Sequence, residues 1–394
     1  MSRQRLDAVI VGGGVVGAAT ALGLARAGLQ VALVEARAPR AWSLQQPDLR
    51  VYALAPDNAA LLQALGVWPA ILSARAQPYR RMRVWDAACD RAEGELVFDA
   101  DRFGRGELGW IVENDLLVDR LWAALPGAGV QLHCPATVEA LEQDAGGVRL
   151  RLDDGRRLEA RVAVAADGGA SALRRLAGFD LDAQAYGQRG VVAFVQTGAP
   201  HADTAWQRFL PTGPLAVLPF TEGRSSIVWT LPEDEAQRIA ALDDDAFARE
   251  LTNAFAARLG PIRPLSPRVG FPLRLQFAHS FVRGRVLLVG DAAHVVHPLA
   301  GQGVNLGLRD VAALLEQVRD AQARRADWTA PHRLRRWAQA RRSDAVVSGR
   351  AFDGINRLYS NAALPATLLR GPLLGLAGRL PPLARALWGH AAGV

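Results

Sequence analysis

Three glycines near the N-terminus and a carboxylate that follows them have the types and spacing needed to bind a phosphorylated cofactor. Gly12, Gly14 and Gly17 follow the pattern GxGxxG. In this pattern the first glycine permits a tight turn, the second lets the backbone approach a pyrophosphate, and the third lets a helix pack closely on a strand. Glu35 stands where a carboxylate accepts hydrogen bonds from a ribose diol. These four residues predict a site for an adenine dinucleotide with a free diol, either FAD or NAD.

Residues 7–36 provide the elements that such a site requires. An apolar run precedes the glycines, a helical pattern closed by Gly28 follows them, and a second apolar run leads to Glu35. This order predicts a strand, a helix and a second strand, with the helix N-terminus facing the phosphates. Glycines in a strand-to-helix turn can also be purely structural, and the motif alone leaves the choice of dinucleotide open.

A second motif lies in residues 286–311, which read VLLVGDAAHVVHPLAGQGVNLGLRDV. They predict a buried strand, a Gly-Asp turn, a loop interrupted by proline, a GQG turn and a helix. The motif resembles the second flavin signature of the aromatic-hydroxylase class of FAD-dependent monooxygenases. The resemblance implies that Asp291 hydrogen-bonds the ribityl chain and that the GQG backbone approaches the pyrimidine edge of the ring. The residues expected at the flavin here are Gly290, Asp291, Gly301, Gln302, Gly303, Val304 and Asn305.

The same motif contains two histidines, His294 and His297, whose spacing raises the question of a metal site. We expect no metal, because Pro298 makes the segment a loop and no third ligand stands at a usable spacing. Acid or base assistance by either histidine is the alternative. Since the flavin performs the chemistry, no catalytic side chain is assigned, and His297 and Pro298 are candidates only for positioning.

A shorter motif lies between these two, in residues 162–174. An apolar strand leads into Asp167 and Gly168, with Ser171 and Arg174 a few residues later. The segment resembles the DG motif of flavin hydroxylases, which implies a part in holding FAD and in contact with a nicotinamide cofactor. The alternative is a plain turn with a solvated aspartate.

The resemblance extends over nearly the whole chain and narrows to the ring hydroxylases of ubiquinone biosynthesis. Residues 48–54, DLRVYAL, are similar to the family segment whose arginine lies against the flavin, which here is Arg50. Further similarity lies in residues 78–86, 96–100 and 108–114. A surface position for Arg50 is the alternative interpretation.

This resemblance implies a mixed α/β fold like that of p-hydroxybenzoate hydroxylase. A Rossmann-like FAD-binding domain carries an inserted mixed β-sheet substrate domain, and a helical region ends the chain. We expect the FAD-binding domain in residues 1–75, 114–180 and 276–325, the substrate domain in residues 76–113 and 181–275, and the helical region in residues 326–394.

Three segments of the substrate domain predict successive strands of a mixed or antiparallel sheet: residues 204–210, 213–220 and 225–230. We expect aromatic side chains of these strands to form one wall of an apolar pocket over the flavin. The candidates are Phe209, Phe220 and Trp229. Aromatic residues on strands also serve as ordinary core, which is the alternative for each. Residues 232–259, 304–325 and 333–357 have helical periodicity.

The function implied by the resemblance is hydroxylation of the ring of a polyprenylated phenol or benzoquinol intermediate of ubiquinone biosynthesis. It would use FAD, molecular oxygen and a flavin C4a-hydroperoxide, with electrons from NAD(P)H or a partner reductase. Two alternatives stay open: an FAD monooxygenase of a small soluble aromatic or secondary metabolite, and a non-catalytic flavoprotein of a lipid-biosynthesis complex.

Charge, cysteine content and the composition of the C-terminal segment indicate which partners and which location to expect for this protein. The net charge is +7, but the basic residues are scattered rather than gathered beside aromatics, so we expect no nucleic-acid partner. Cys89 and Cys134 have no metal-site spacing, which favours a reduced, cytoplasmic protein. The segment from Leu364 onward is apolar, dotted with arginine, and broken by proline and glycine. It predicts peripheral contact with the inner membrane, contact with partners in a ubiquinone-biosynthesis complex, or a helical lid on the protein's own core.

Overall fold

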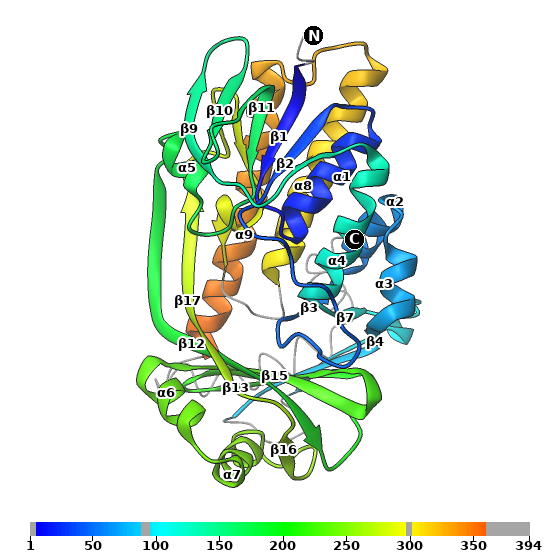
Figure 1. Cartoon of the computed structure of the whole chain (residues 1–394). Helices are drawn as coiled ribbons and strands as arrows, with labels where there is room; N and C mark the ends of the chain where they lie inside the picture. Colours follow the sequence, from blue (N-terminus) through cyan, green and yellow to red (C-terminus); the bar gives the residue numbers. More distant parts are fainter. Residues whose placement is uncertain (1–4, 88–94, 297–301, 360–394) are drawn as a thin grey trace.

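The computed structural model describes residues 5–87, 95–296 and 302–359. Two sheets dominate the chain, one in the upper and one in the lower part of the view in Figure 1. The upper sheet is flanked by α1 (Val15–Arg26), α4 (Asn114–Ala124) and α8 (Gln302–Ala323). Two long strands, β12 (Leu181–Thr197) and β17 (Val269–Ala278), run between the two parts.

The upper sheet contains a parallel core with the strand expected before the first glycine at its centre. Its order is β18 (Val282–Arg283), β19 (Val286–Leu288), β11 (Arg157–Ala165), β1 (Leu6–Val11), β2 (Val31–Val34) and β8 (Gln131–His133). The pairs β8–β2, β2–β1, β1–β11 and β11–β19 are parallel. Helices cover such a sheet on its faces, and this explains why β1 and β2 are nearly continuous apolar runs. A hairpin of β9 (Val138–Gln143) and β10 (Val148–Leu152) extends β11.

The register aligns the ends of the parallel strands at one edge. Val11 at the end of β1 pairs with Val34 of β2 and Ala165 of β11. The expected βαβ unit in residues 7–36 is therefore confirmed as β1, α1 and β2. The loops that follow these three strand ends, with the glycines, Glu35 and Asp167, meet at this edge.

Helix α1 packs against α8, so the two expected flavin motifs lie side by side in space. Gly23 of α1 leaves room for Leu315 of α8, and a Cβ at Gly23 would come within 2.5 Å of that side chain. The following helix, α9 (Pro331–Tyr359), packs on α8. Both helices confirm the helical periodicity of residues 304–325 and 333–357. The part of the tail from Leu364 onward lies outside the described residues.

The lower sheet is built from strands that are distant in sequence. Its order is β20 (His294–Val295), β17, β12, β15 (Arg224–Pro232), β14 (Gly213–Pro219), β13 (Thr204–Leu210), β5 (Arg81–Asp86) and β6 (Glu95–Asp99), with β16 (Ile262–Pro264) beside β12. All pairs are antiparallel except β13 with β5. The three strands expected in residues 204–230 are thus confirmed.

One face of the lower sheet is closed by two helices. α6 (Glu233–Ala241) and α7 (Asp244–Ala254) account for the helical periodicity of residues 232–259. Their apolar sides meet a buried cluster that includes Trp85, Trp206 and Trp229. The opposite face of the sheet is turned toward the upper part of the molecule.

A third sheet of three short strands lies between these parts. It has the order β3 (Val51–Leu54), β7 (Gly109–Glu113) and β4 (Ala76–Tyr79), and it lies beside α2 (Pro56–Ala64) and α3 (Trp68–Arg75). Among the described residues of 76–113, only β5 and β6 join the lower sheet. The domain boundaries expected from the sequence remain a proposal.

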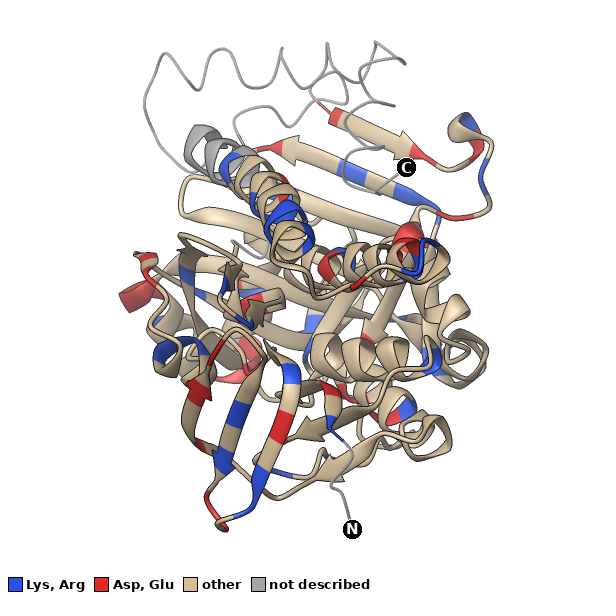
Figure 2. Ribbon diagram, turned by 90° about the horizontal axis from the view of Figure 1, so that it is seen from above, with Lys and Arg blue, Asp and Glu red and all other residues tan. Residues whose placement is uncertain are grey.

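Opposite charges are interspersed on the surface, as Figure 2 shows. On the β9–β10 hairpin, for example, Arg149 pairs with Glu142 and Arg151 with Glu139. In the described residues, no helix is both long enough and apolar enough to cross a membrane.

Candidate active site

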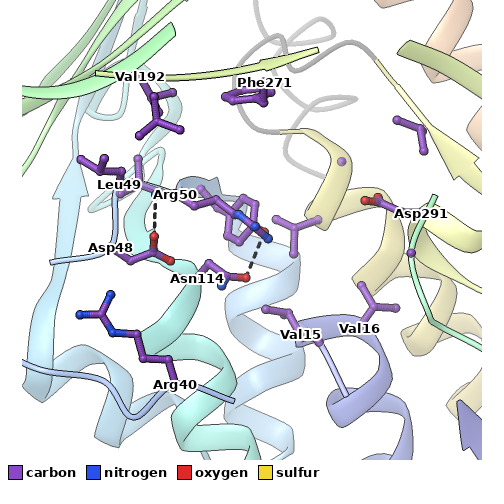
Figure 3. Close-up of a pocket in the computed structure, with 18 of the residues that line it drawn as sticks. Val15, Val16, Arg40, Asp48, Leu49, Arg50, Asn114, Val192, Phe271 and Asp291 are labelled. Carbon is purple, nitrogen blue, oxygen red and sulfur yellow. Dashed lines mark hydrogen bonds between the residues drawn. The ribbon is translucent and has the colours of Figure 1, made fainter. Parts of the chain in front are cut away.

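One cavity of about 1610 Å³ lies between the strand-end edge of the upper sheet and the free face of the lower sheet. Both parts of the chain contribute to its lining, which includes Gly12, Glu35, Arg50 and Asp291. Figure 3 shows Val192 and Phe271 on one side, Val15, Val16 and Asn114 on the opposite side, and Arg50 extending between them. A cavity of this size exceeds the range of about 300–1,000 Å³ usual for one small molecule. It has room for a dinucleotide and a second molecule.

The first glycine motif forms a turn in which side chains are excluded. Gly12 has φ +105°, and a Cβ there would lie 2.4 Å from the carbonyl oxygen of Ala166. A Cβ on Gly17 would lie 1.9 Å from the carbonyl oxygen of Gly12. Gly14 precedes α1, and the position of its missing Cβ is open: apart from its chain neighbours, no atom in the described part of the chain lies within 4 Å of it. The turn is therefore tight on its inner side and bare where it lines the cavity.

Glu35 follows β2 and is held in place by backbone groups. Its carboxylate accepts hydrogen bonds from the N–H groups of Gly13 and Arg37. Each carboxylate oxygen has more than one acceptor direction, so these bonds leave Glu35 able to accept from a ribose hydroxyl. The structure thus brings Glu35, Gly12 and Gly14 together at the cavity, and Gly17 packs against Gly12 without lining it.

Asp167 has a local structural role in addition to its place in the lining. Its carboxylate accepts from the Ser171 hydroxyl and from the N–H groups of Ala172 and Leu173, at 2.7 and 3.1 Å, and so caps α5 (Ala172–Leu176). Gly168, with φ +82°, presents bare backbone to the cavity. The DG motif therefore combines a capped turn with an open backbone segment.

The buried Arg174 connects this turn to the second motif. Its guanidinium donates to the carbonyl oxygen of Ala292 at 2.8 Å and to that of Gly169 at 2.7 Å. Ala292 belongs to η5 (Gly290–Ala292), the single helical turn that carries Asp291. The loops at 167–169 and 290–292 are therefore held together on one side of the cavity.

Arg50 stands just before β3, in a group of polar side chains. The neighbouring Tyr52 phenol raises the pKa of Arg50, and Asp48 and Asp115 add to this against the effect of burial. Burial raises the pKa of Tyr52, which donates to Asn114 Oδ1 at 3.2 Å. Arg50 is charged and Tyr52 neutral at pH 7. Tyr52 shares a strand face with Arg50, so strand alternation alone could have identified it.

A buried ion pair holds the segment that precedes Arg50. Glu113, fully buried, lies 3.1 Å from Arg75 Nε and accepts from the N–H of Asp48 at 2.9 Å and from the indole of Trp42 at 3.2 Å. Asp48 in turn accepts from the N–H of Arg50 at 2.9 Å. The cavity wall at residues 45–50 thus depends on a carboxylate that does not itself line the cavity.

Asp291 faces the cavity from η5, on the far side from Asp48 in Figure 3. Desolvation by the surrounding protein raises the pKa of its carboxyl group, although the side chain is exposed to the cavity, while His294 and Arg50 oppose that shift. The net pKa stays raised, so the surroundings of Asp291 favour the ionised form less than water does. This position is compatible with the ribityl contact expected from the sequence.

Behind Asp291 lies a buried polar network that the sequence reasoning missed. Asp310 of α8 accepts from the N–H of Gly290 at 3.0 Å, lies 2.7 Å from His294 Nε2, and accepts from Arg341 Nε of α9 at 2.8 Å. Burial raises the pKa of Asp310, but His294 and Arg341 outweigh it and the net pKa is lowered. His294 is thus the partner of a buried carboxylate. No local sequence signal links these three residues, because they come together only when α8 and α9 pack.

The GQG turn is described only in part. Gly301, His297 and Pro298 lie outside the described residues, and Gln302 begins α8. Gly303 and Val304 line the cavity, and the missing Cβ position of Gly303 is open. In the described parts of the chain, no three or more His, Cys, Asp or Glu side chains are grouped to hold a metal ion.

The side chain of Asn305 points elsewhere than we expected. It is fully buried, accepts from the N–H of Ala55 at 2.9 Å and from Asn58 at 2.8 Å, and donates to the carbonyl of Ala53 at 2.8 Å. These bonds join α8 to the turn between β3 and α2. Asn305 does not line the cavity, so its side chain has a structural position.

The prediction of which aromatic residues form the cavity wall is wrong. Phe209, Phe220 and Trp229 are each at most 4% exposed, and none lines the cavity. Trp229 lies on the opposite face of the sheet, under α6 and α7, because its neighbours Val228 and Thr230 face the cavity. Phe209 and Phe220 are covered by the clusters around Leu96 and Ile111.

Other side chains of the lower sheet, from β12, β13, β14, β15 and β17, form the wall instead. It comprises Val192, Phe194, Gln207, Pro214, Ala216, Leu218, Val228, Thr230, Phe271 and Leu273. Most are aliphatic or aromatic, so this part of the cavity is mainly apolar and lies directly across from the glycine-lined part. The alternation of residues along the strands correctly separates the two faces of the lower sheet. It does not show which of these faces lines the cavity.

The residues present fit an adenine dinucleotide of flavin type. At three places, Gly14, Gly168 and Gly303, bare backbone lines the cavity, and beyond their near chain neighbours no atom of the described residues lies within 4 Å of the missing Cβ. Glu35 provides the acceptor for a ribose at one end, and Asp291 and Arg50 provide opposite charges farther along. Such a bare, polar channel next to an apolar wall suits a dinucleotide whose ring must approach an apolar partner.

Comparison with solved structures defines the class of fold. The chain is similar to p-nitrophenol 4-monooxygenase PnpA from Pseudomonas putida DLL-E4, with a TM-score of 0.78 and 21% identity over 98% of this chain and 96% of that one. It is also similar to Klebsiella pneumoniae HpxO, solved with FAD and uric acid, with a TM-score of 0.76 and 20% identity over the same shares. The mixed α/β fold is therefore that of the FAD-dependent aromatic hydroxylases.

Sequence comparison narrows the class to a family. Residues 5–341 match the protein family that is described as FAD binding domain. The ubiquinone hydroxylase UbiL of Rhodospirillum rubrum is 38% identical over 98% of this chain and 89% of its own length. The 3-demethoxyubiquinol 3-hydroxylase of Escherichia coli is 36% identical over the full length of both, and human COQ6, a ubiquinone biosynthesis monooxygenase, is 32% identical over 92% of this chain and 87% of its own. The chain belongs to the ubiquinone-biosynthesis hydroxylases, and it is an FAD-dependent aromatic hydroxylase.

Proposed function

We propose that this enzyme hydroxylates the ring of a polyprenylated phenol or benzoquinol intermediate of ubiquinone biosynthesis. The observation that carries the proposal is the mainly apolar wall of the lower sheet, which faces the glycine-lined channel across a single cavity. An apolar ring bearing a prenyl chain gains free energy when such a wall removes it from water. The named activities of UbiL, the Escherichia coli 3-hydroxylase and COQ6 agree with this substrate class.

In this proposal each group of residues has a distinct part in holding the cofactor. Gly12, Gly14 and the N-terminus of α1 bind the pyrophosphate, and Glu35 accepts from the ribose diol. Asp291 holds the ribityl chain, and Arg50 lies against the ring system. Gly168 and Gly303 permit close approach of the backbone on either side.

When bound, FAD supplies the reduction and activation of oxygen that no side chain provides. The chain's own task is then to orient the substrate ring and to exclude water. Val192, Ala216, Leu218 and Phe271 line the apolar part of the cavity and offer no hydrogen bonds from their side chains to water. Such a dry wall suppresses loss of activated oxygen to solvent. Electrons come from NAD(P)H or from a partner reductase.

The enzyme meets its substrate at a membrane in this proposal, because a polyprenylated ring is dissolved there. The composition of the segment from Leu364 onward supports peripheral contact with the inner membrane, since apolar residues alternate with Arg370, Arg379 and Arg385. Partners in a ubiquinone-biosynthesis complex are a further part of the proposal. Flotation of the full chain and of a chain ending at residue 363 with anionic vesicles tests the membrane contact, provided that both retain FAD.

The decisive experiment is a product analysis with purified enzyme. Detergent-solubilised prenylated phenol, reductant and oxygen should yield a hydroxylated ring, and deletion of the gene should cause the unhydroxylated intermediate to accumulate. Release of peroxide without a prenylated product, together with turnover of a small soluble phenol, would contradict the proposed substrate. Bound FAD with no turnover of either would indicate a non-catalytic flavoprotein.

A further inference from the structure

The apolar wall contains one buried amide that the proposed function has not used. Gln207 of β13 is only 6% exposed and lines the cavity, yet its side chain has no hydrogen-bond partner among the described residues. A ligand that fills the cavity removes this amide from water, and a buried amide left unpaired costs free energy, so the ligand has to supply a partner. The cavity is where that partner must come from.

The register of the lower sheet places Gln207 in a row with apolar neighbours. It pairs with Ala216 of β14, Ala216 pairs with Val228 of β15, and Val228 pairs with Val192 of β12. All four line the cavity. Because paired residues lie on the same face of a sheet, Gln207 is the one polar member of these four, and it stands where the row leaves the cavity, since its other neighbour, Val84 of β5, does not line the cavity. A ring lying on Ala216 and Val228 presents one edge to this amide.

We propose that Gln207 recognises a neutral oxygen substituent on the substrate ring and so sets which ring edge is held. The proposal rests on the proposed function, because it assumes an aromatic ring against this wall. The amide has a carbonyl acceptor and two N–H donors. It pairs with a phenolic hydroxyl, a methoxy oxygen or a quinone carbonyl, whereas a purely hydrocarbon ring leaves it unpaired.

A second polar side chain borders the same apolar area. Thr230 of β15 is 2% exposed, lines the cavity, and likewise has no hydrogen-bond partner for its hydroxyl among the described residues. Two arginines of the lower sheet also line the cavity: Arg224 is paired with Glu222 and stacked over Phe220, and Arg274 lies on β17. The hydrogen-bonding side chains beside Ala216 and Val228 are those of Gln207 and Thr230, which are both uncharged, and this favours neutral oxygen substituents on a ring held there.

The test is a binding comparison on the FAD-loaded enzyme that does not depend on turnover. The probes are a short-chain prenylated methoxyphenol and the same prenylated ring with methyl groups in place of both oxygen substituents. Binding is followed by the change in the flavin absorbance spectrum. Wild type should bind the oxygenated probe about tenfold more tightly, the effect of one hydrogen bond whose loss strands a buried partner.

Gln207→Met and Gln207→Leu should each bring that ratio close to one, while the FAD content stays at the wild-type level. Gln196→Met is the matched control, because Gln196 is an exposed glutamine of the same sheet that does not line the cavity. It should keep the tenfold ratio. If both Gln207 variants keep the tenfold preference for the oxygenated probe, the inference about Gln207 is wrong, while the proposed function is unaffected. If wild type binds neither probe, the proposed substrate class falls, and this inference falls with it.

Discussion

Glu35 shows how a single side chain can serve both the fold and a ligand. Its carboxylate receives two backbone N–H groups, from Gly13 and Arg37, and it also lines the cavity. The first of these bonds ties the glycine turn to the end of β2. A substitution here therefore removes an acceptor for the ribose and also loosens the turn that is to meet the pyrophosphate.

We predict that Glu35→Ala weakens FAD binding by about 1.5–3 kcal/mol, the loss of hydrogen bonds to a charged group. This corresponds to roughly a ten- to hundredfold higher dissociation constant. Fluorescence titration of the apoprotein with FAD measures it. Glu139→Ala is the control, because Glu139 pairs with Arg151 on the exposed β9–β10 hairpin. Equal affinity in both variants would mean that Glu35 is only structural.

For Asp291 we predict a larger loss of hydroxylation than of stability. The side chain faces the cavity and none of its described contacts is a hydrogen bond to another element, so Asp291→Ala should leave the unfolding midpoint nearly unchanged. The ring of the flavin would then be less well positioned, and more of the reductant consumed should yield peroxide instead of product. The ratio of product to peroxide at saturating FAD checks this. A wild-type ratio would show that the second motif is misassigned.

At the scale of elements, the network around Asp310 joins three segments that no local pattern links. It connects η5, which carries Asp291, to α8 and, through Arg341, to α9. All three side chains are at most 9% exposed. Since removal of one partner from a buried ion pair leaves an uncompensated charge, this network stabilises the packing of α9 as well as the position of the Gly290–Asp291 turn.

We predict that Asp310→Asn lowers the free energy of unfolding by about 3 kcal/mol at pH 7. The lowered pKa of Asp310 means that its carboxylate stabilises the fold above the unfolded-state pKa of about 3.9 and loses this effect as the pH falls through the folded-state value. The difference between wild type and variant should therefore shrink below about pH 4. Urea unfolding at several pH values measures it.

The control for this prediction lies on the same helix. Asp320→Asn removes a carboxylate that is paired with Arg324 and Arg333 but 38% exposed. An exposed ion pair contributes about 0–1 kcal/mol, so the effect of this change should be small. A comparable loss in the two variants would argue against a special contribution of the buried network.

At the scale of the whole molecule, the site exists only because two sheets face each other. The glycine-lined channel belongs to the upper sheet, and the apolar wall belongs to the lower one. The long strands β12 and β17 run between them, so the parts are connected by paired backbone and not only by loops. A cofactor that contacts the upper part and the 45–50 segment together stabilises the folded chain by mass action.

We predict about one non-covalent FAD per chain, and a gain of about 2.7 kcal/mol in stability when free FAD is present at a hundred times its dissociation constant. Absorbance and chemical unfolding measure the two quantities. FMN, which lacks the adenosine part, should stabilise far less, because it cannot engage the glycine turn and Glu35 together. A colourless protein that gains no flavin on reconstitution would contradict the cofactor assignment.

The sequence by itself determined the features that depend on short stretches of chain. The GxGxxG turn follows from steric demands within a few residues, and the structure confirms the strand, the helix and the tight contact of Gly17 with Gly12. The strands and helices of residues 204–259 followed from their periodicities. The fold and the enzyme class were predicted from the family resemblance, because the motifs lie in a recognisable order over nearly the full chain.

Only the tertiary structure decided which side chains meet in the cavity. Alternation separates Trp229 from Val228 and Thr230, but it cannot tell which face α6 and α7 will cover. Asn305 stands in the flavin motif, yet it bonds to the turn after β3. Likewise, the contacts of Asp310 and the isolation of Gln207 arise from elements far apart in the chain. The physical reason is that burial and pairing depend on the packing of distant elements, and a local pattern does not contain that information.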